Sequence, residues 1–101
     1  MKTIIIVYTA KKLSEADKRK LKKYAFNTEA DLKVGDVLES QSYGSPMQVI
    51  KVLEEKYDFY NASTGELSNS YNSTSQWEIL DMVIQEKNNR TVYASIRKDD
   101  N

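Results

Sequence analysis

The stretch that decides the fold is "LKVGDVLES", residues 32–40, in which one Gly-Asp pair separates two short apolar runs. Glycine readily adopts a positive φ angle, and an aspartate carboxylate accepts hydrogen bonds from nearby backbone amides. Gly35 and Asp36 therefore predict a sharp bend that leads into a strand over residues 37–40. A phosphate- or metal-binding loop would need further glycines or carboxylates around the pair, and the neighbouring residues do not supply them.

Further short β-type segments lie on both sides of this bend. They are rich in β-branched and aromatic residues and cover residues 2–9, 24–27, 47–53, 56–61 and 91–96. Apolar side chains on both faces of residues 2–9 predict a strand that is buried on both sides. Turn signals at 44–46 ("GSP") and 64–66 ("TGE") separate the later strands.

The apolar segment 76–86 fits either a buried helix or a long strand. Residues 87–90, "KNNR", are typical of a hairpin connection into the next β-type segment, so the strand is the favoured interpretation. This hairpin is expected to be an addition at the C-terminal end of the domain. Several short strands at regular spacing predict a mainly β (α+β) fold, a small barrel or a sandwich, in a single domain over residues 1–101.

One short helix is predicted over residues 13–23. Ser14 is placed to cap it, with Asp17 at the third following position as in a capping box. Four apolar residues fall within one arc at helical spacing, namely Leu13, Ala16, Leu21 and Tyr24. A helix this short needs to dock against the domain in order to persist.

Charge is distributed unevenly along the chain. Lysine plus arginine and aspartate plus glutamate each number 15, so the formal net charge is zero. Residues 1–23 hold eight basic and two acidic residues, a net charge of +6, and the rest of the chain carries −6. Such an asymmetry is typical of a segment that binds polyanions.

The composition weighs against enzymatic chemistry. The chain has neither cysteine nor histidine, which removes thiolate chemistry, the commonest general base and the commonest metal ligand. The nearest carboxylate pairs, Asp36 with Glu39 and Glu54 with Asp58, are interpreted as surface charge because nothing supplies an apolar pocket. No catalytic residue, cofactor or metal site is therefore predicted.

The first ten residues, "MKTIIIVYTA", resemble a signal peptide only superficially. Their apolar core is shorter than the ~7–15 residues of such a segment, and Lys11 and Lys12 follow at once. No apolar run approaches the ~20 residues of a membrane span, so no membrane association is expected.

Three pieces of sequence carry a family resemblance. They are Tyr24-x-Phe26, then Leu32-Lys33-Val34-Gly35-Asp36-x-Leu38, and then Val49-x-Lys51-Val52. Together they resemble the SH3-like small β-barrels of bacterial and tailed-phage proteins. The resemblance covers about thirty residues and implies a docking platform for protein or nucleic acid, with no catalytic residue. Size and composition are similar to phage accessory proteins, which implies the cytoplasm of a bacterial host or a virion as the location.

The leading functional hypothesis is a non-enzymatic protein-binding or assembly module that contacts a protein partner or a second copy of itself. Tyr57, Tyr60 and Tyr71 are the predicted contact residues, because tyrosine is enriched at protein interfaces. The polar segment 61–76, "NASTGELSNSYNSTSQ", is predicted to be a long loop that takes part in this contact.

The alternative hypothesis is nucleic-acid binding through the basic segment 11–23 with help from exposed aromatic rings. Its predicted contact residues are Lys18, Arg19, Lys20, Lys22 and Lys23. A solvated helix face is the simpler interpretation of this segment, because Glu15 and Asp17 dilute its charge. An enzyme is the least favoured of the three classes.

Overall fold

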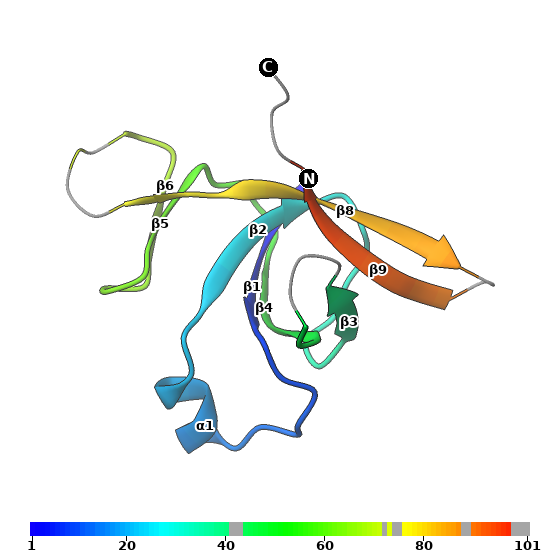
Figure 1. Ribbon diagram of the computed structural model, residues 1–101. Helices are drawn as coiled ribbons and strands as arrows, with labels where there is room; N and C mark the ends of the chain where they lie inside the picture. Colours follow the sequence, from blue (N-terminus) through cyan, green and yellow to red (C-terminus); the bar gives the residue numbers. More distant parts are fainter. Residues whose placement is uncertain (41–43, 72, 74–75, 88–89, 98–101) are drawn as a thin grey trace.

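The computed structural model of the chain describes residues 1–40, 44–71, 73, 76–87 and 90–97 (Figure 1). It is a mainly β fold in which a strongly curled sheet carries a smaller three-stranded sheet and one short helix. The strands of the curled sheet are β1 (Lys2–Val7), β2 (Tyr24–Thr28), β3 (Val37–Ser40), β4 (Met47–Leu53), β8 (Leu80–Lys87) and β9 (Arg90–Arg97). The smaller sheet contains β5 (Phe59–Asn61), β6 (Glu66–Ser68) and β7 (Trp77–Glu78).

The pairing of the strands produces the curl. The order in the large sheet is β1-β2-β8-β9-β3-β4, and β4 also pairs with β1. In the smaller sheet β5 lies between β6 and β7. Figure 1 shows this sheet projecting to the left of the curled sheet, with the helix below it. The mainly β class and the strand assignment of residues 80–86 are confirmed.

Strand β1 is buried on both faces, as its sequence predicts. Ile4 and Ile6 face the interior of the curled sheet, where they form the main core with Phe26, Leu32, Leu38, Met47, Val49 and Met82. Ile5 points to the other side, because successive residues of a strand face opposite ways. There it packs with Tyr60 and Ile79 in a second core, which joins the smaller sheet to the outside of the curled sheet.

The Gly-Asp pair forms the predicted bend. Gly35 has a φ angle of 97°, and the Asp36 carboxylate accepts a hydrogen bond of 2.8 Å from the backbone amide of Lys33. The bend is tied to β4, because the amide of Gly35 donates to the carbonyl of Val49 at 2.8 Å and the amide of Val49 donates to the carbonyl of Asp36 at 2.9 Å. The chain therefore enters β3 beside the strand with which it pairs.

A closed circuit of hydrogen bonds fixes the start of the smaller sheet. The hydroxyl of Thr3 donates to the side-chain oxygen of Asn27, whose amide nitrogen donates to the carbonyl of Tyr57 at 2.9 Å. The backbone amide of Tyr57 in turn donates to the Thr3 hydroxyl at 2.8 Å. Thr3 and Asn27 are buried, and each polar group in the circuit has a partner. A satisfied buried network of this kind holds its members in one arrangement.

The helix is shorter than the sequence predicts. Helix α1 spans Glu15–Lys20, and the capping box formed by Ser14 and Asp17 is present. Leu21 is already extended (φ −74°, ψ 142°), and Tyr24 belongs to β2. The predicted apolar arc over residues 13–24 is therefore wrong, and α1 buries none of its residues. From Tyr24 onward the chain instead pairs with β1 as strand β2.

Three other predictions need correction. The segment 61–76 is not a loop throughout its described part, because residues 66–68 form β6 opposite β5. The C-terminal hairpin is not an addition outside the fold: β8 pairs in parallel with β2 and β9 pairs in parallel with β3, so the hairpin completes the curled sheet. Parallel pairing joins segments that are far apart in sequence, which explains why local patterns do not reveal it. The expected strand at 56–61 is also shorter, since β5 begins at Phe59.

Candidate basic–aromatic binding site

The three tyrosines predicted as protein contacts lie in different surroundings. Tyr71 is 78% exposed, and its ring meets that of Phe59 edge-to-face at 5.7 Å between centroids. Tyr57 is half-buried, and its hydroxyl lies 3.4 Å from the Glu55 carboxylate. Tyr60 is only 5% exposed and belongs to the second core. Its ring therefore has a structural role, and little of it is open to a partner.

The basic segment is brought against the smaller sheet rather than left wholly in solvent. Lys22 lies over two aromatic rings, and Lys18 and Lys23 line a pocket beside the second core. Arg19 and Lys20 are exposed on α1. Three of the five predicted basic residues thus converge on the corner between the curled sheet and the smaller sheet.

Lys22, Tyr24 and Trp77 form what we call the cationic–aromatic cluster. The Lys22 ammonium lies 5.3 Å from the centroid of the Tyr24 ring and 4.9 Å from that of Trp77. Both distances are within the ~6 Å over which a cation is attracted to a ring face. Tyr8 packs edge-to-face on Tyr24 with centroids 4.9 Å apart, which fixes the Tyr24 ring. Trp77 is 47% exposed and presents an open aromatic surface.

The cluster borders a cavity of about 190 Å³, which we call the first pocket. Its lining is Tyr8, Tyr24, Ala25, Phe26, Tyr60, Trp77, Glu78 and Leu80. β2 and β7 supply most of these residues, and the pairing of β7 with β5 carries Trp77 to this position opposite Tyr60. The pocket is therefore aromatic, with the Lys22 ammonium at its edge and Glu78 as the acidic residue of its lining.

A second pocket of about 260 Å³ lies on the other side of Tyr60. Its apolar part consists of Ile5, Ile50, Tyr60 and Leu67, and its cations are Lys18, Lys23 and Lys51. Both pockets are smaller than the ~300–1,000 Å³ that a whole small-molecule ligand occupies. Each therefore has the size for one ring or one side chain of a larger ligand.

The positive charges of this corner are largely uncompensated. In the described part of the chain, Lys22, Lys23 and Lys51 make no ion pair, and Lys18 lies 3.6 Å from the exposed Glu15. Exposed pairs of this kind contribute ~0–1 kcal/mol, so Lys18 remains available to an anion. Burial raises the pKa of the Tyr60 phenol above its ordinary value of 10.0.

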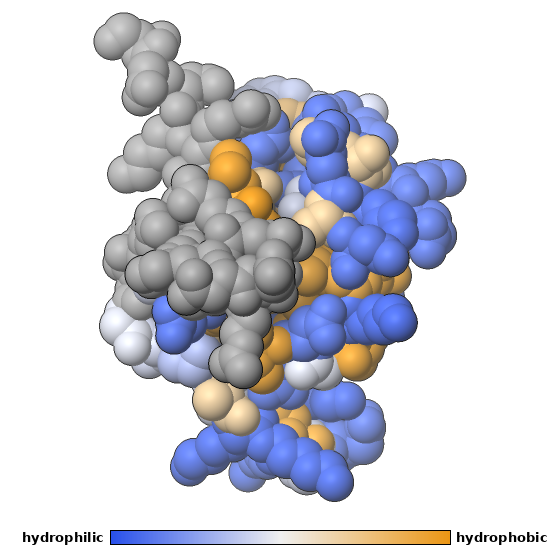
Figure 2. All heavy atoms as spheres, turned by 90° about the vertical axis from the view of Figure 1, so that its right-hand side faces the viewer, coloured by the Kyte–Doolittle hydropathy of each residue, from blue (hydrophilic) through white to orange (hydrophobic). Residues whose placement is uncertain are grey.

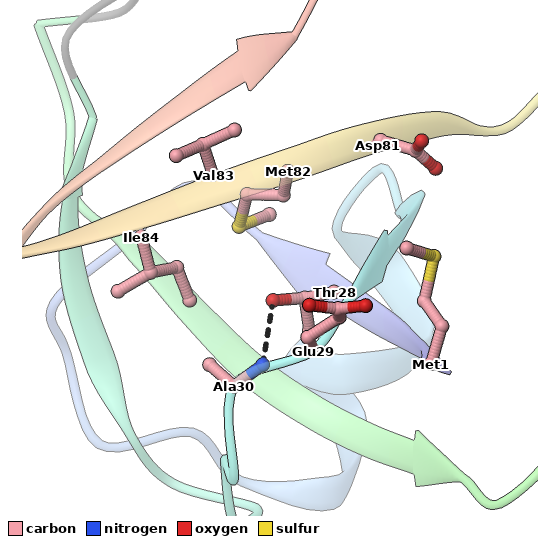
Figure 3. A pocket seen from close by; sticks show the side chains of 8 residues that line it. All are labelled: Met1, Thr28, Glu29, Ala30, Asp81, Met82, Val83 and Ile84. Carbon is pink, nitrogen blue, oxygen red and sulfur yellow. Dashed lines mark hydrogen bonds between the residues drawn. The ribbon is translucent and has the colours of Figure 1, made fainter.

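A hollow of about 510 Å³ lies at the end of β2 (Figure 3). Figure 3 shows Met82 and Ile84 pointing from β8 into it and Val83 pointing away. Its acidic lining residues are Glu29 and Asp81. Among the residues that the structure describes, no three acidic side chains gather to hold a metal ion. A hollow with this lining does not suit an anion, and we assign no ligand to it.

The face at the right of Figure 1 has a different character (Figure 2). Figure 2 shows hydrophilic side chains over much of this face, with apolar ones between them. The described apolar residues that are exposed on β3 and β8 are Val37 and Val83. Single exposed apolar side chains are normal on a protein surface and indicate no site.

Sequence reasoning missed three members of the corner. Trp77, Lys51 and Glu78 were not among the predicted site residues, because the pairing of β7 with β5 and the position of β4 place them there. The available signal was composition: Trp77 is the single tryptophan of a chain whose lysines cluster at the N-terminal end.

Within the described ranges, no helix has the length and apolar character needed to cross a membrane. Comparisons of the chain with protein-family models, with curated proteins and with solved structures found no match.

Proposed function

We propose that this protein is a non-enzymatic binding module that takes single-stranded nucleic acid at the first pocket. The observation that carries the proposal is the position of the Lys22 ammonium beside two ring faces, of which Trp77 is half exposed. Proteins that bind single strands combine cations for the phosphates with aromatic rings for the bases. The cationic–aromatic cluster offers a cation and two aromatic rings, with the Lys22 ammonium 4.9 Å from the Trp77 ring centroid and 5.3 Å from that of Tyr24.

In the proposed complex a base stacks on the open surface of Trp77, and Lys22 moves from the rings to a phosphate. An exposed cation–π contact is worth only ~0.5–1 kcal/mol, so this exchange costs little. Glu78, which lines the same pocket, repels phosphates and keeps the backbone on the side of Lys22. Because stacking uses ring faces that every base has, little sequence preference is expected.

The test uses the single tryptophan as its own reporter. Titration with a dT oligomer of about twelve nucleotides should quench the Trp77 fluorescence, because the ring stacks on a base. Trp77→Ala should weaken binding of a labelled oligomer about 5- to 150-fold, which corresponds to the ~1–3 kcal/mol of one stacked base. Tyr71→Ala is the matched control, since it removes an exposed ring away from the cluster and should leave affinity unchanged.

Two results would contradict the proposal. One is the absence of any quenching at low salt, where electrostatic binding is strongest. The other is an equal loss of affinity in Trp77→Ala and Tyr71→Ala. That result would show that the oligomer does not bind specifically at the cationic–aromatic cluster.

Protein binding is a second proposal, and one observation favours it. Tyr71 is exposed and its ring is positioned by Phe59, while β6 lies at the edge of the smaller sheet. An edge strand with a neighbouring aromatic side chain can accept an additional strand from a partner or a second copy. Sedimentation of the wild type and of Tyr71→Ala tests self-association through this edge. The substitution should weaken the association. If both proteins sediment as monomers, self-association is excluded.

We also propose, as a finer description of the curled sheet, the SH3-like barrel that the sequence resembles. Phe26, Leu38 and Val49 from the three resembling segments support it, because they meet in one core. A solved structure of the chain that superposes on such a barrel would establish the assignment. The phage origin stays a proposal, which the neighbouring genes would test.

A further inference from the structure

We propose that the second pocket is a second base-binding subsite for the same nucleic-acid strand, with Lys18, Lys23 and Lys51 holding the phosphates around it. This inference rests on the proposed single-strand function and adds a second contact to it. The buried Tyr60 lines both pockets and is the one lining residue that they share. A strand that binds both pockets would place one base in each, with this ring staying in the second core between them.

The backbone after α1 connects the two pockets. The chain is extended at Leu21, and neighbouring residues of an extended chain direct their side chains to opposite sides. Lys22 accordingly reaches Tyr24 and Trp77 at the first pocket, whereas Lys23 lines the second. Lys22 thus lies at the first pocket and Lys23 at the second. In the proposed complex they would contact consecutive phosphates of one strand.

The lining of the second pocket fits a base flanked by phosphates. Its floor is apolar, from Ile5, Ile50 and Leu67, and its three cations come from separate elements, namely α1, the segment before β2, and β4. An amphiphile with one carboxylate would engage one of these cations, whereas a nucleic-acid strand brings several phosphates. Charge complementarity therefore favours the strand, and a volume of about 260 Å³ limits the inserted group to one ring or side chain.

The test measures how binding depends on salt. Each phosphate that a lysine neutralises on a single strand contributes ~0.7 to the slope of log affinity against log salt concentration. The double variant Lys23→Gln/Lys51→Gln should therefore lower the slope for a dT twelve-mer by about 1.4. Quenching of Trp77 at saturation should persist, because the first pocket is intact. The control is Lys33→Gln, which removes an exposed lysine near the Gly35 bend and should leave the slope unchanged.

A second measurement uses ligand length. Thymidine monophosphate reaches only one pocket at a time, so its quenching of Trp77 should be the same in the wild type and in the double variant. A loss of affinity that appears with the twelve-mer and not with the mononucleotide supports two subsites on one strand.

Each alternative outcome is distinguishable. If the double variant and Lys33→Gln have the same slope while Trp77 is still quenched, the second subsite is refuted and the proposed function stands. If the wild type binds no oligomer, the proposed function fails and this inference fails with it. If dodecanoate binds the wild type and is displaced by neither oligomer nor mononucleotide, the second pocket belongs to an amphiphile and the inference is overturned.

Discussion

Replacing Thr3 with valine tests whether the buried hydrogen-bond circuit positions the site. Valine has nearly the shape of threonine but removes the hydroxyl, which donates to Asn27 and accepts from the amide of Tyr57. Two polar groups then lose their partner, and each buried unsatisfied group costs ~1–3 kcal/mol. Because Tyr57 as a residue is only half-buried, we place the cost at its amide at the low end of this range and expect a total loss of about 2–4 kcal/mol in the free energy of unfolding.

Thr3→Ser provides the matched comparison. Serine keeps the hydroxyl and loses one methyl group, which costs about 1 kcal/mol through lost burial and the small cavity that remains. The two variants therefore reverse the order expected from hydrophobicity, since the more apolar valine is the more destabilising. Urea unfolding followed by Trp77 fluorescence and by circular dichroism measures both values.

Thr3→Val should also affect binding. Tyr57 leads into β5, whose Tyr60 separates the two pockets, so Thr3→Val should also weaken oligomer binding at temperatures where the protein is folded. A valine variant as stable as the wild type, or more stable than the serine variant, would refute the role assigned to the circuit.

Three further predictions follow from single side chains. Glu78→Gln removes the negative charge of the acidic residue at the first pocket, so the affinity for a dT twelve-mer should rise about two- to fivefold at low salt, an exposed-charge effect of ~0.5–1 kcal/mol; unchanged affinity would place the phosphates elsewhere. Gln48→Met removes the amide that donates to the carbonyls of Thr9 at 3.3 Å and Lys11 at 2.8 Å. It should cost about 1–2 kcal/mol of stability and accelerate tryptic cleavage after Lys11, whereas wild-type cleavage rates would contradict this anchoring. Burial raises the pKa of Tyr60 above 10.0 in the folded state, so its contribution to stability is present below pH 10 and is lost as the pH rises further. Urea unfolding between about pH 9 and 11 should show a smaller alkaline loss in Tyr60→Phe than in the wild type, and equal losses would show that Tyr60 does not titrate differently on unfolding.

Much of the local structure is readable from the chain. The Gly35-Asp36 bend, the cap formed by Ser14 and Asp17, and the strand at 47–53 need only neighbouring residues, and all three are present. The two buried faces of β1 follow from its unbroken apolar run. These features depend on φ preferences, short-range hydrogen bonds and alternation, which the sequence specifies within a few positions.

The candidate site was only half predictable. Lys18, Lys22 and Lys23 stand out as a charge cluster, but their partners Trp77 and Lys51 are distant in sequence. The exposed or buried state of the tyrosines was equally hidden, since Tyr57, Tyr60 and Tyr71 were predicted alike as contacts and yet differ in burial. Strand registry decides such questions, because a shift of one residue reverses the face on which a side chain lies.

The sequence alone determined the β class, the bend at Gly35, the capped helix start and the basic character of residues 1–23, because each depends on nearby residues. Tertiary structure alone decided that the C-terminal hairpin completes the curled sheet, that α1 ends at Lys20, and that Lys22 meets Trp77. The physical reason is that these outcomes depend on long-range strand pairing, whose energy comes from burial between segments that no local pattern connects.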